Sequence, residues 1–217
     1  MSGSRTVFVI DDDPVVRRAL IFLLSTEGLV GQGFSSAQDF LEAHETLSHG
    51  CVVVDLRMPG MDGLDLQREL ARRRSLLPVI VITGHGTVPE AIAALKGGAF
   101  EFLEKPLKDD VFLDCVRRAL DWDAATQARA AEIADYQARA ASLTARETDV
   151  MRLVIEGHQN KNIAHQLSIS LRTVEIHRGR VMEKMGARTA SELVRIMLTL
   201  DAAAAPETEG ADTARSH

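Results

Sequence analysis

The sequence has no long hydrophobic run, and only two of its 217 residues are cysteines. No apolar stretch approaches the roughly 20 residues that cross a bilayer, and residues 1–6 lack the apolar core of a signal peptide. These absences exclude a membrane-spanning protein and favour the cytoplasm. Because Cys51 and Cys115 both lie in apolar stretches, we interpret them as reduced core residues and not as a disulfide.

The chain also lacks any internal repeat, and its charge is unevenly distributed. Hydrophobic residues make up 46% and charged residues 26% of the sequence, which is ordinary for a globular protein. The net charge is −6, yet residues 142–200 carry 9 Lys/Arg against 6 Asp/Glu. A length of 217 residues suits two small domains or one larger one. The short basic segment alone is a weak sign of nucleic-acid binding.

The first 121 residues alternate short apolar runs with amphipathic stretches. Five strand–helix pairs predict a parallel sheet with helices on both faces. Three of the runs contain no polar alternation, which is typical of central strands covered on both sides. The predicted strands are residues 7–10, 29–34, 51–54, 79–83 and 100–103.

The second half of the chain is predicted to be all helical. Residues 122–141 are rich in Ala and Arg and contain no Gly or Pro. This composition predicts an extension of the preceding helix or a separate linker helix, with a weak coiled coil as a further alternative. Gly157 and Gly186 are natural helix stops. Residues 201–217, rich in Ala, Glu and Thr, predict a disordered tail. The predicted helices of residues 142–200 are 146–156, 160–167, 171–185 and 190–200.

Polar side chains cluster where the predicted strands end. In a doubly wound sheet the reactive site lies beyond the carboxyl ends of the strands. Crowded carboxylates have raised pKa values unless a cation joins them, and hard oxygen ligands suit Mg²⁺. A carboxylate beside an ammonium and a hydroxyl is a suitable nucleophile toward a phosphoryl group. These residues are Asp11, Asp12, Asp55, Thr83 and Lys105.

Each of these residues alone has a plain structural interpretation as a helix cap, a turn former or a loop residue. Their joint placement favours the functional one. The carrying motifs are VIDDD at 9–13, VDLRMPGMDG at 54–63, ITGHG at 82–86 and FLEKP at 102–106. Together they make residues 6–121 resemble the receiver domain of two-component response regulators, which has a flavodoxin-like (βα)5 fold.

The resemblance implies specific roles for the acidic edge. Asp55 would accept a phosphoryl group from a sensor histidine kinase. Mg²⁺ would be held by Asp12, Asp55 and the Arg57 backbone carbonyl, with Asp11 acting mostly through water. Lys105 would contact the phosphate, beside a cis peptide to the following proline.

The resemblance also implies how the signal leaves the site. Thr83 and Phe102 would form the switch, and residues 87–102 would form the face of a phosphorylation-dependent homodimer. From their positions we further hypothesise that Arg57 and His85 obstruct the water that would hydrolyse the acyl phosphate.

One alternative for the first motif is a phosphatase of the haloacid-dehalogenase type. The pattern Asp11-x-Asp13-x-Val15 after a strand also fits that family and would make Asp11 the nucleophile. The run at 58–63 and the length of the domain favour the receiver.

The second half carries a further set of motifs: LTxRE at 143–147, NKxIAxxL at 160–167, ISxxTVxxH at 169–177 and KMG at 184–186. They resemble the four-helix LuxR/NarL-type helix-turn-helix domain. Combined with the receiver, the chain resembles the FixJ-like response regulators. The predicted organisation is a receiver at 1–121, a helical linker at 122–141, a DNA-binding domain at 142–200 and a disordered tail at 201–217.

Helical periodicity assigns the two faces of the predicted second helix of this motif. Val174, Val181 and Met185 share one face with His177, which we interpret as a structural, hydrogen-bonded residue. The opposite face would enter the major groove, while flanking residues suit phosphates. The outer face carries Arg172, Glu175, Ile176, Gly179, Arg180 and Glu183, and the further candidates are Lys161, Asn162, Thr173, Arg178 and Lys184.

Two of these positions depart from the family pattern. Many members carry Lys where Glu175 stands and a basic residue where Gly179 stands, so base readout cannot be transferred. Without the motif spacing, the helical half could equally be a protein-interaction module. The sequence thus predicts a transcription regulator, not an enzyme, whose partners are a sensor kinase, promoter DNA, a second copy of itself and RNA polymerase.

Overall fold

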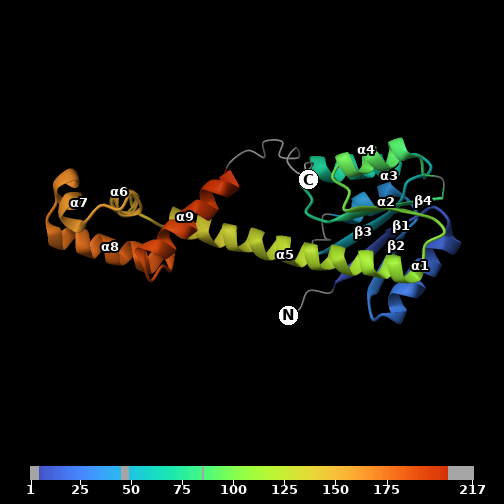
Figure 1. Ribbon diagram of the computed structural model, residues 1–217, viewed down its shortest axis with the longest axis horizontal. Coiled ribbons are helices and arrows are strands. Elements are labelled where there is room, and N and C mark those ends of the chain that lie inside the picture. The colour runs from blue at the N-terminus through green and yellow to red at the C-terminus, as the bar shows by residue number, and fades with distance from the viewer. Residues whose placement is uncertain (1–4, 45–48, 85, 205–217) are drawn as a thin grey trace, which may run out of the picture. The chain divides into compact units, whose positions relative to one another are not determined.

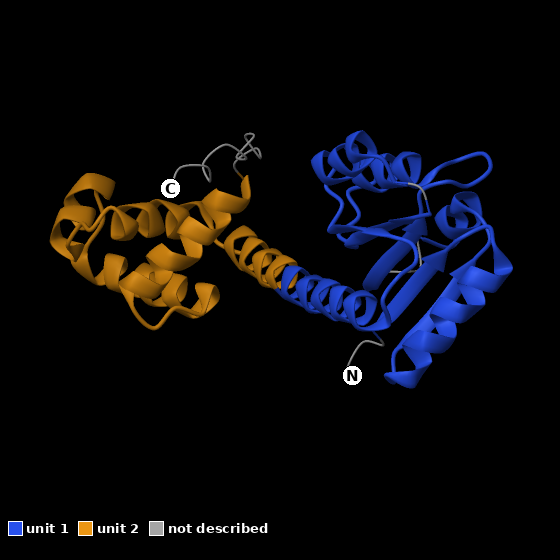
Figure 2. Cartoon of the chain, turned by 45° about the vertical axis from the view of Figure 1, so that its right-hand side comes forward, with its two compact units in different colours: residues 1–128 blue, residues 129–217 orange. Residues whose placement is uncertain are grey.

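The computed structural model describes residues 5–44, 49–84 and 86–204, and the chain divides into two compact units, residues 1–128 and 129–217 (Figures 1 and 2). The first unit alternates strands and helices, and the second is helical. In chain order the first unit contains β1 (Thr6–Ile10), α1 (Pro14–Thr26), β2 (Val30–Phe34), α2 (Ala37–Ala43), β3 (Gly50–Asp55), α3 (Gly63–Arg72), β4 (Val79–Thr83), α4 (Val88–Lys96), β5 (Glu101–Glu104) and the start of α5 (Asp109–Ala141).

The five strands form one parallel sheet in the order β2-β1-β3-β4-β5. Buried side chains of α2, α3 and α4 pack on one face of the sheet, and those of α1 and α5 pack on the other. β3 is buried along its whole length because helices cover both of its faces. This arrangement confirms the predicted α/β fold.

Local sequence explains where the elements begin. The Asp13 side chain accepts a hydrogen bond from the backbone N–H of Val15, and Pro14 occupies the first helical position of α1. All five predicted strands are present. β5 starts one residue later than predicted, at Glu101.

The second unit contains α6 (Ala145–Ile155), α7 (Asn160–Leu167), α8 (Leu171–Met185) and α9 (Ala190–Ala204) around a single apolar core. Gly157 and Gly186 follow α6 and α8 with φ of +84° and +68°, the left-handed region in which glycine is favoured. The prediction of disorder from residue 201 is wrong for residues 201–204, which continue α9. Their run of alanines has high helix propensity. Residues 205–217 lie outside the described residues.

The predicted linker, residues 122–141, lies entirely within α5, a helix of 33 residues that begins in the first unit and ends in the second. Its two ends belong to different cores: Leu120 is buried in the first unit, whereas Tyr136 and Ala140 pack against the core of the second. Among the described residues no helix is long and apolar enough to cross a membrane.

The side chain of Asp123 fixes α5 to the sheet. It is buried, and its Oδ2 accepts a hydrogen bond of 2.9 Å from the backbone N–H of Gly50 at the start of β3. Gln127 donates to its other oxygen at 3.3 Å. A Cβ at residue 50 would lie 2.0 Å from the Thr6 carbonyl oxygen, so only glycine fits there. No sequence pattern indicated this contact.

Asp123→Ala is expected to lower the free energy of unfolding of the first unit by about 1–3 kcal/mol, because a buried N–H loses its acceptor. Urea unfolding followed by the fluorescence of Trp122, the sole tryptophan, measures the change. The matched control is Asp121→Ala, which removes only an exposed ion pair with Arg5 and is expected to shift stability by less than about 0.5 kcal/mol. Equal effects of the two substitutions would contradict the role given to Asp123.

Candidate functional site

The carboxyl ends of the strands bring the predicted acidic residues to one edge of the sheet. β1 is in register with β3 up to Ile10 and Val54, so Asp11 and Asp55 leave neighbouring strands together. Thr83, at the end of β4, is in register with Glu104, the residue before Lys105. Parallel pairing therefore places these four side chains at the same edge.

The ammonium of Lys105 joins two of the carboxylates. Its Nζ donates to Asp55 Oδ1 at 2.7 Å and to Asp11 Oδ2 at 2.9 Å. The side chains are 22%, 9% and 2% exposed for Lys105, Asp55 and Asp11. Burial raises the pKa of the Asp11 carboxyl, although the hydrogen bond from Lys105 lowers it. Burial alone would lower the pKa of Lys105, but the hydrogen bonds to Asp55 and Asp11 raise it above its ordinary value.

The predicted magnesium ligands follow β1 and end or follow β3. Asp55 Oδ2 accepts a hydrogen bond of 2.8 Å from the backbone N–H of Arg57, and Asp12 is exposed. Within residues 5–44, 49–84 and 86–204, no three acidic, histidine or cysteine side chains form a group that could hold a metal ion. The Lys105 ammonium supplies positive charge between Asp11 and Asp55. The predicted cis peptide between Lys105 and Pro106 is present.

The two predicted switch residues lie close to the same loop. Thr83 is fully buried, and Phe102 is half-buried against the core beneath α4. A Cβ on Gly86 would lie 2.8 Å from Thr83 Cγ2 and 3.0 Å from the Phe102 ring. The loop after β4 therefore touches both side chains, and only glycine allows so close an approach.

Arg57 makes a contact that the sequence did not predict. Its guanidinium donates to Glu90 Oε1 at 2.5 Å. Glu90 is the third residue of α4 and forms a capping box with Thr87. The pattern Thr87-x-x-Glu90 is a recognisable helix start, but it does not indicate a partner 33 residues away. His85, the second residue of the hydrolysis hypothesis, lies outside the described residues.

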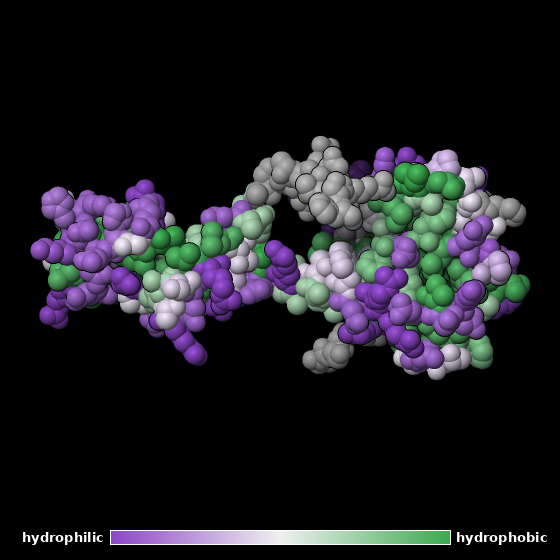
Figure 3. Space-filling view, viewed as in Figure 1, coloured by the Kyte–Doolittle hydropathy of each residue, from purple (hydrophilic) through white to green (hydrophobic). Residues whose placement is uncertain are grey.

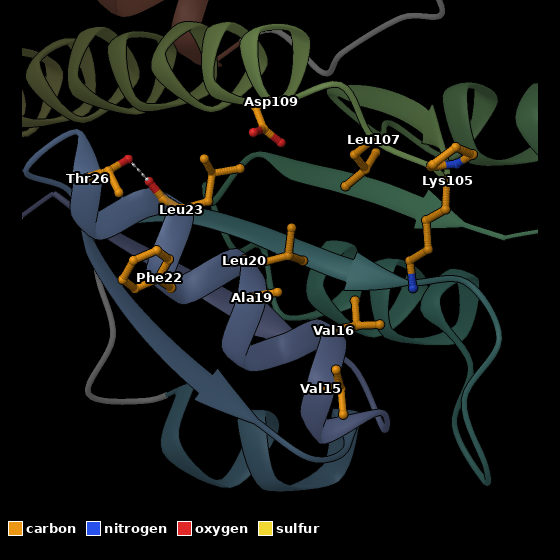
Figure 4. Close-up of a pocket in the computed structure, with 11 residues that line it drawn as sticks. Val15, Val16, Ala19, Leu20, Phe22, Leu23, Thr26, Lys105, Leu107 and Asp109 are labelled. Atoms are coloured by element: carbon orange, nitrogen blue, oxygen red, sulfur yellow. Dashed lines mark hydrogen bonds between the residues drawn. The ribbon is translucent and has the colours of Figure 1, made fainter.

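An apolar groove borders the charged edge. It has a volume of about 720 Å³ and runs between α1 and the segment that joins β5 to α5. Figure 4 shows Val16 and Leu20 of α1 near Leu107, with Lys105 at one end. Apolar surface thus adjoins the carboxylate–ammonium cluster.

In the second unit α7 and α8 form the predicted helix-turn-helix. Ser168 adopts a left-handed conformation with φ of +55°, and the Ser170 side chain accepts from the Thr173 N–H at 3.1 Å at the start of α8. Val174, Val181 and Met185 are buried, as the periodicity predicted. Hydrophilic side chains gather over α7 and α8 (Figure 3). The exposed candidates are Lys161, Asn162, Arg172, Glu175, Ile176, Gly179, Arg180 and Glu183.

The structure gives other partners to several candidates. Arg178 donates to Asn160 Oδ1 at 2.9 Å, which ties α8 to the start of α7. Lys184 donates to Glu147 Oε2 at 2.7 Å and to the Ser142 carbonyl at 3.0 Å. Thr173 is half-buried, and its hydroxyl lies 2.7 Å from the Ser170 hydroxyl. These contacts position α8, so the three side chains are less available for DNA than the exposed candidates.

The interpretation of His177 needs a correction. The residue lies on the inner face of α8 and is half-buried, but its Nδ1 is buried without a hydrogen-bond partner in the described part of the chain. Periodicity identified the face correctly. It could not show whether Nδ1 would have a hydrogen-bond partner there.

Comparison with known proteins gives matches to both units. The receiver domain of response regulators matches residues 7–117, and the luxR family of bacterial regulatory proteins matches residues 141–197. FixJ, a transcriptional regulatory protein of Bradyrhizobium diazoefficiens, is 44% identical over 198 residues, covering 91% of this chain and 97% of its own.

Solved structures agree with these matches. The response regulator StyR has a TM-score of 0.84 and 38% identity, covering 90% of this chain and 99% of its own. The beryllofluoride-activated receiver-domain dimer of NtrC4 has a TM-score of 0.51 and 33% identity, covering 54% of this chain and 96% of its own.

The ion pair between the buried Glu147 and the half-buried Lys184 makes the second unit sensitive to acid. The Glu147 side chain is 2% exposed, and hydrogen bonds from Lys184 and from the Thr144 N–H lower its pKa from 4.5 to about 2. Because its folded pKa is lowered, the unfolded chain binds more protons between these values, so stability is lost as the pH falls from 4.5 to about 2.

Lys184→Met is therefore expected to raise the pKa of Glu147 toward 4.5. The ¹³C chemical shift of the Glu147 carboxyl, followed by NMR against pH, measures this value. The control Lys161→Met removes an exposed lysine of α7 and should leave the titration unchanged. An unaltered Glu147 titration in Lys184→Met would rule out the pairing.

Proposed function

The chain belongs to the response regulators that join a receiver domain to a LuxR-type DNA-binding domain, and from this we propose that phosphorylation of Asp55 by a sensor histidine kinase controls its binding to promoter DNA. It is a FixJ-like transcriptional regulator and not an enzyme. The receiver implies a histidine kinase as partner, and the luxR-family domain implies DNA.

One observation carries the assignment of Asp55. It is the last residue of a fully buried strand, and its carboxylate accepts a hydrogen bond from the Lys105 ammonium. The ammonium neutralises negative charge on the Asp55 carboxylate oxygens. It would neutralise the oxygens of an incoming phosphoryl group in the same way. Asp11 holds the ammonium from the other side. The Thr83 hydroxyl, at the end of the next strand, contacts the phosphoryl group once it is attached.

The residues present fit Mg²⁺ in chemical type. Carboxylate and carbonyl oxygens are its preferred protein ligands, and Asp55 ends β3 beside β1, the strand that Asp11 and Asp12 follow. Asp12, Asp55 and the Arg57 carbonyl would hold the ion, with Asp11 acting mostly through water. The ion would neutralise the phosphoryl oxygens.

The output proceeds through Thr83 and Phe102 to the face formed by residues 87–102. Hydrophobic residues gather over α4 in Figure 3. Val88, Ile92 and Leu95 of α4 are exposed, Val88 by 74%. Apolar surface of this kind favours association, and the receiver of NtrC4 is described as a dimer in its beryllofluoride-activated form. Phosphorylation makes this face a symmetric dimer interface, which suits paired DNA half-sites.

The DNA-binding surface is the exposed side of α8 with the first turn of α7. Arg172 and Arg180 serve guanine edges or phosphates, and Glu175 accepts from cytosine or stays exposed. Lys161 and Asn162 contact phosphates. Transcription is activated through RNA polymerase, and the protein acts in the cytoplasm.

Two alternative functions, a phosphatase and a regulator without DNA binding, predict different experimental results. A phosphatase would turn over phosphate esters, and family membership argues against it. A regulator that acts only through protein contacts would fail to shift promoter DNA even when phosphorylated, and the luxR-family match argues against that.

Asp55→Asn is expected to abolish phosphorylation and to leave the protein monomeric with acetyl phosphate and Mg²⁺, because an amide replaces the nucleophilic carboxylate. Analytical ultracentrifugation of the full chain measures the oligomeric state. The control Asp110→Asn changes an exposed carboxylate at the start of α5 and should dimerise as the wild type does. Full dimerisation of Asp55→Asn under these conditions would refute Asp55 as the acceptor.

Arg180→Ala is expected to weaken binding of the phosphorylated protein to its promoter by about 1–3 kcal/mol, since a cation on the exposed face of α8 is removed. Fluorescence anisotropy with labelled DNA at fixed salt gives the affinity. Arg195→Ala, an exposed residue of α9, should bind within about twofold of the wild type. Unchanged affinity in Arg180→Ala would exclude Arg180 from the DNA interface.

A further inference from the structure

Arg57 connects the phosphoacceptor to α4 through a single residue. Its backbone N–H donates to Asp55 Oδ2 at 2.8 Å, on the carboxylate oxygen that Lys105 does not contact. Its guanidinium donates to Glu90 Oε1 at 2.5 Å. The Arg57 side chain is 69% exposed, so it can move without disturbing the core. The backbone of Arg57 therefore contacts Asp55, while its side chain contacts α4.

Glu90 is the fixed partner in this pair. Its Oε2 accepts from the Thr87 N–H and from the Thr87 hydroxyl, both at 2.9 Å, and these bonds do not involve Arg57. The backbone hydrogen bond from Thr87 is the largest cause of the lowered pKa of Glu90, which keeps the carboxylate ionised. The Glu90 carboxylate thus keeps its position at the first turn of α4 whether or not Arg57 is bound to it.

The first turn of α4 has few other attachments. Ala94 is the only residue of α4 that is buried in the described part of the chain, and it lies in the second half of the helix. Val88, the most exposed large apolar residue of the proposed dimer face, is the first residue of α4. A tether at Glu90 therefore acts on the end of the helix that the core holds least.

A phosphoryl group on Asp55 would compete for the guanidinium. It adds about 1.5–2 negative charges and three acceptor oxygens beside the Arg57 backbone. Arginine binds phosphate through paired hydrogen bonds, whereas an exposed pair with one carboxylate is weak. The stronger acceptor is thus the one created by phosphorylation.

We propose that Glu90 is a positioning residue: it holds the Arg57 guanidinium on α4 until a phosphoryl group on Asp55 takes it, which frees the first turn of α4 for dimerisation. The proposal rests on Asp55 as the phosphoacceptor. Linkage makes the effect reciprocal. If the phosphoryl group breaks the ion pair, then removing the ion pair must strengthen binding of a phosphoryl mimic.

Beryllofluoride with Mg²⁺ is the probe, titrated into the full chain and followed by NMR. Glu90→Gln keeps a capping-box side chain but removes the charge, so it is expected to tighten beryllofluoride binding by about two- to fivefold, the range of exposed ion pairs. In an Arg57→Gln background the same substitution should have no effect. Glu27→Gln, which removes a comparable exposed pair with Arg117, is the matched control and should leave the affinity unchanged.

A second measurement does not depend on the Glu90 variant. The Arg57 Nε–H signal of the wild type is expected to shift when beryllofluoride binds, because the guanidinium changes partners. An unmoved signal, unchanged or weaker binding in Glu90→Gln, or an equal gain with Arg57→Gln present would overturn the proposal while leaving Asp55 as acceptor. Failure of the wild type to bind beryllofluoride, or equal binding by Asp55→Asn, would overturn the proposed function itself and this inference with it.

Discussion

The receiver unit depends on the positive charge of one lysine. Asp11 and Asp55 end up almost buried because β1 and β3 are central strands, and two buried carboxylates side by side are unfavourable without a counter-ion. Lys105, delivered by the end of β5, bonds to both. The same contact that allows these carboxylates to be buried also compensates charge where a phosphoryl group is proposed to attach. Stability and reactivity of this edge therefore rest on the same three side chains.

The second unit uses side-chain contacts to hold one helix while leaving its outer face open. Arg178 joins α8 to α7, Lys184 joins it to the buried Glu147, and Arg139 of α5 donates to the Met185 carbonyl at its end. Each of these cations is used within the unit. The exposed positions of α8 remain accessible, and they lie on a helix that is held at its middle and at its C-terminal end.

The parts of the molecule that follow from chain topology were predictable from the sequence. Once five parallel strands were recognised, Asp11, Asp55, Thr83 and Lys105 had to meet, since the carboxyl ends of parallel strands share one edge. Contacts between helices were not predictable in this way. The pairs Arg57–Glu90 and Glu147–Lys184 span 33 and 37 residues and depend on how whole helices are placed. Periodicity identified the face of His177 but not the missing partner of its Nδ1.

The bond between Asp123 and Gly50 also bears on where one module ends and the next begins. A receiver ended at residue 121 would keep every strand but lose the carboxylate that bonds to the first residue of β3. Exchange of receivers between regulators should therefore carry α5 at least through Gln127, which supports that carboxylate. On the other side of the junction, Tyr136 and Ala140 already belong to the helical core. Only a few turns of α5 lie between the residues that contact the first unit and those that pack in the second. The point at which two regulators can be fused is therefore restricted to this short segment.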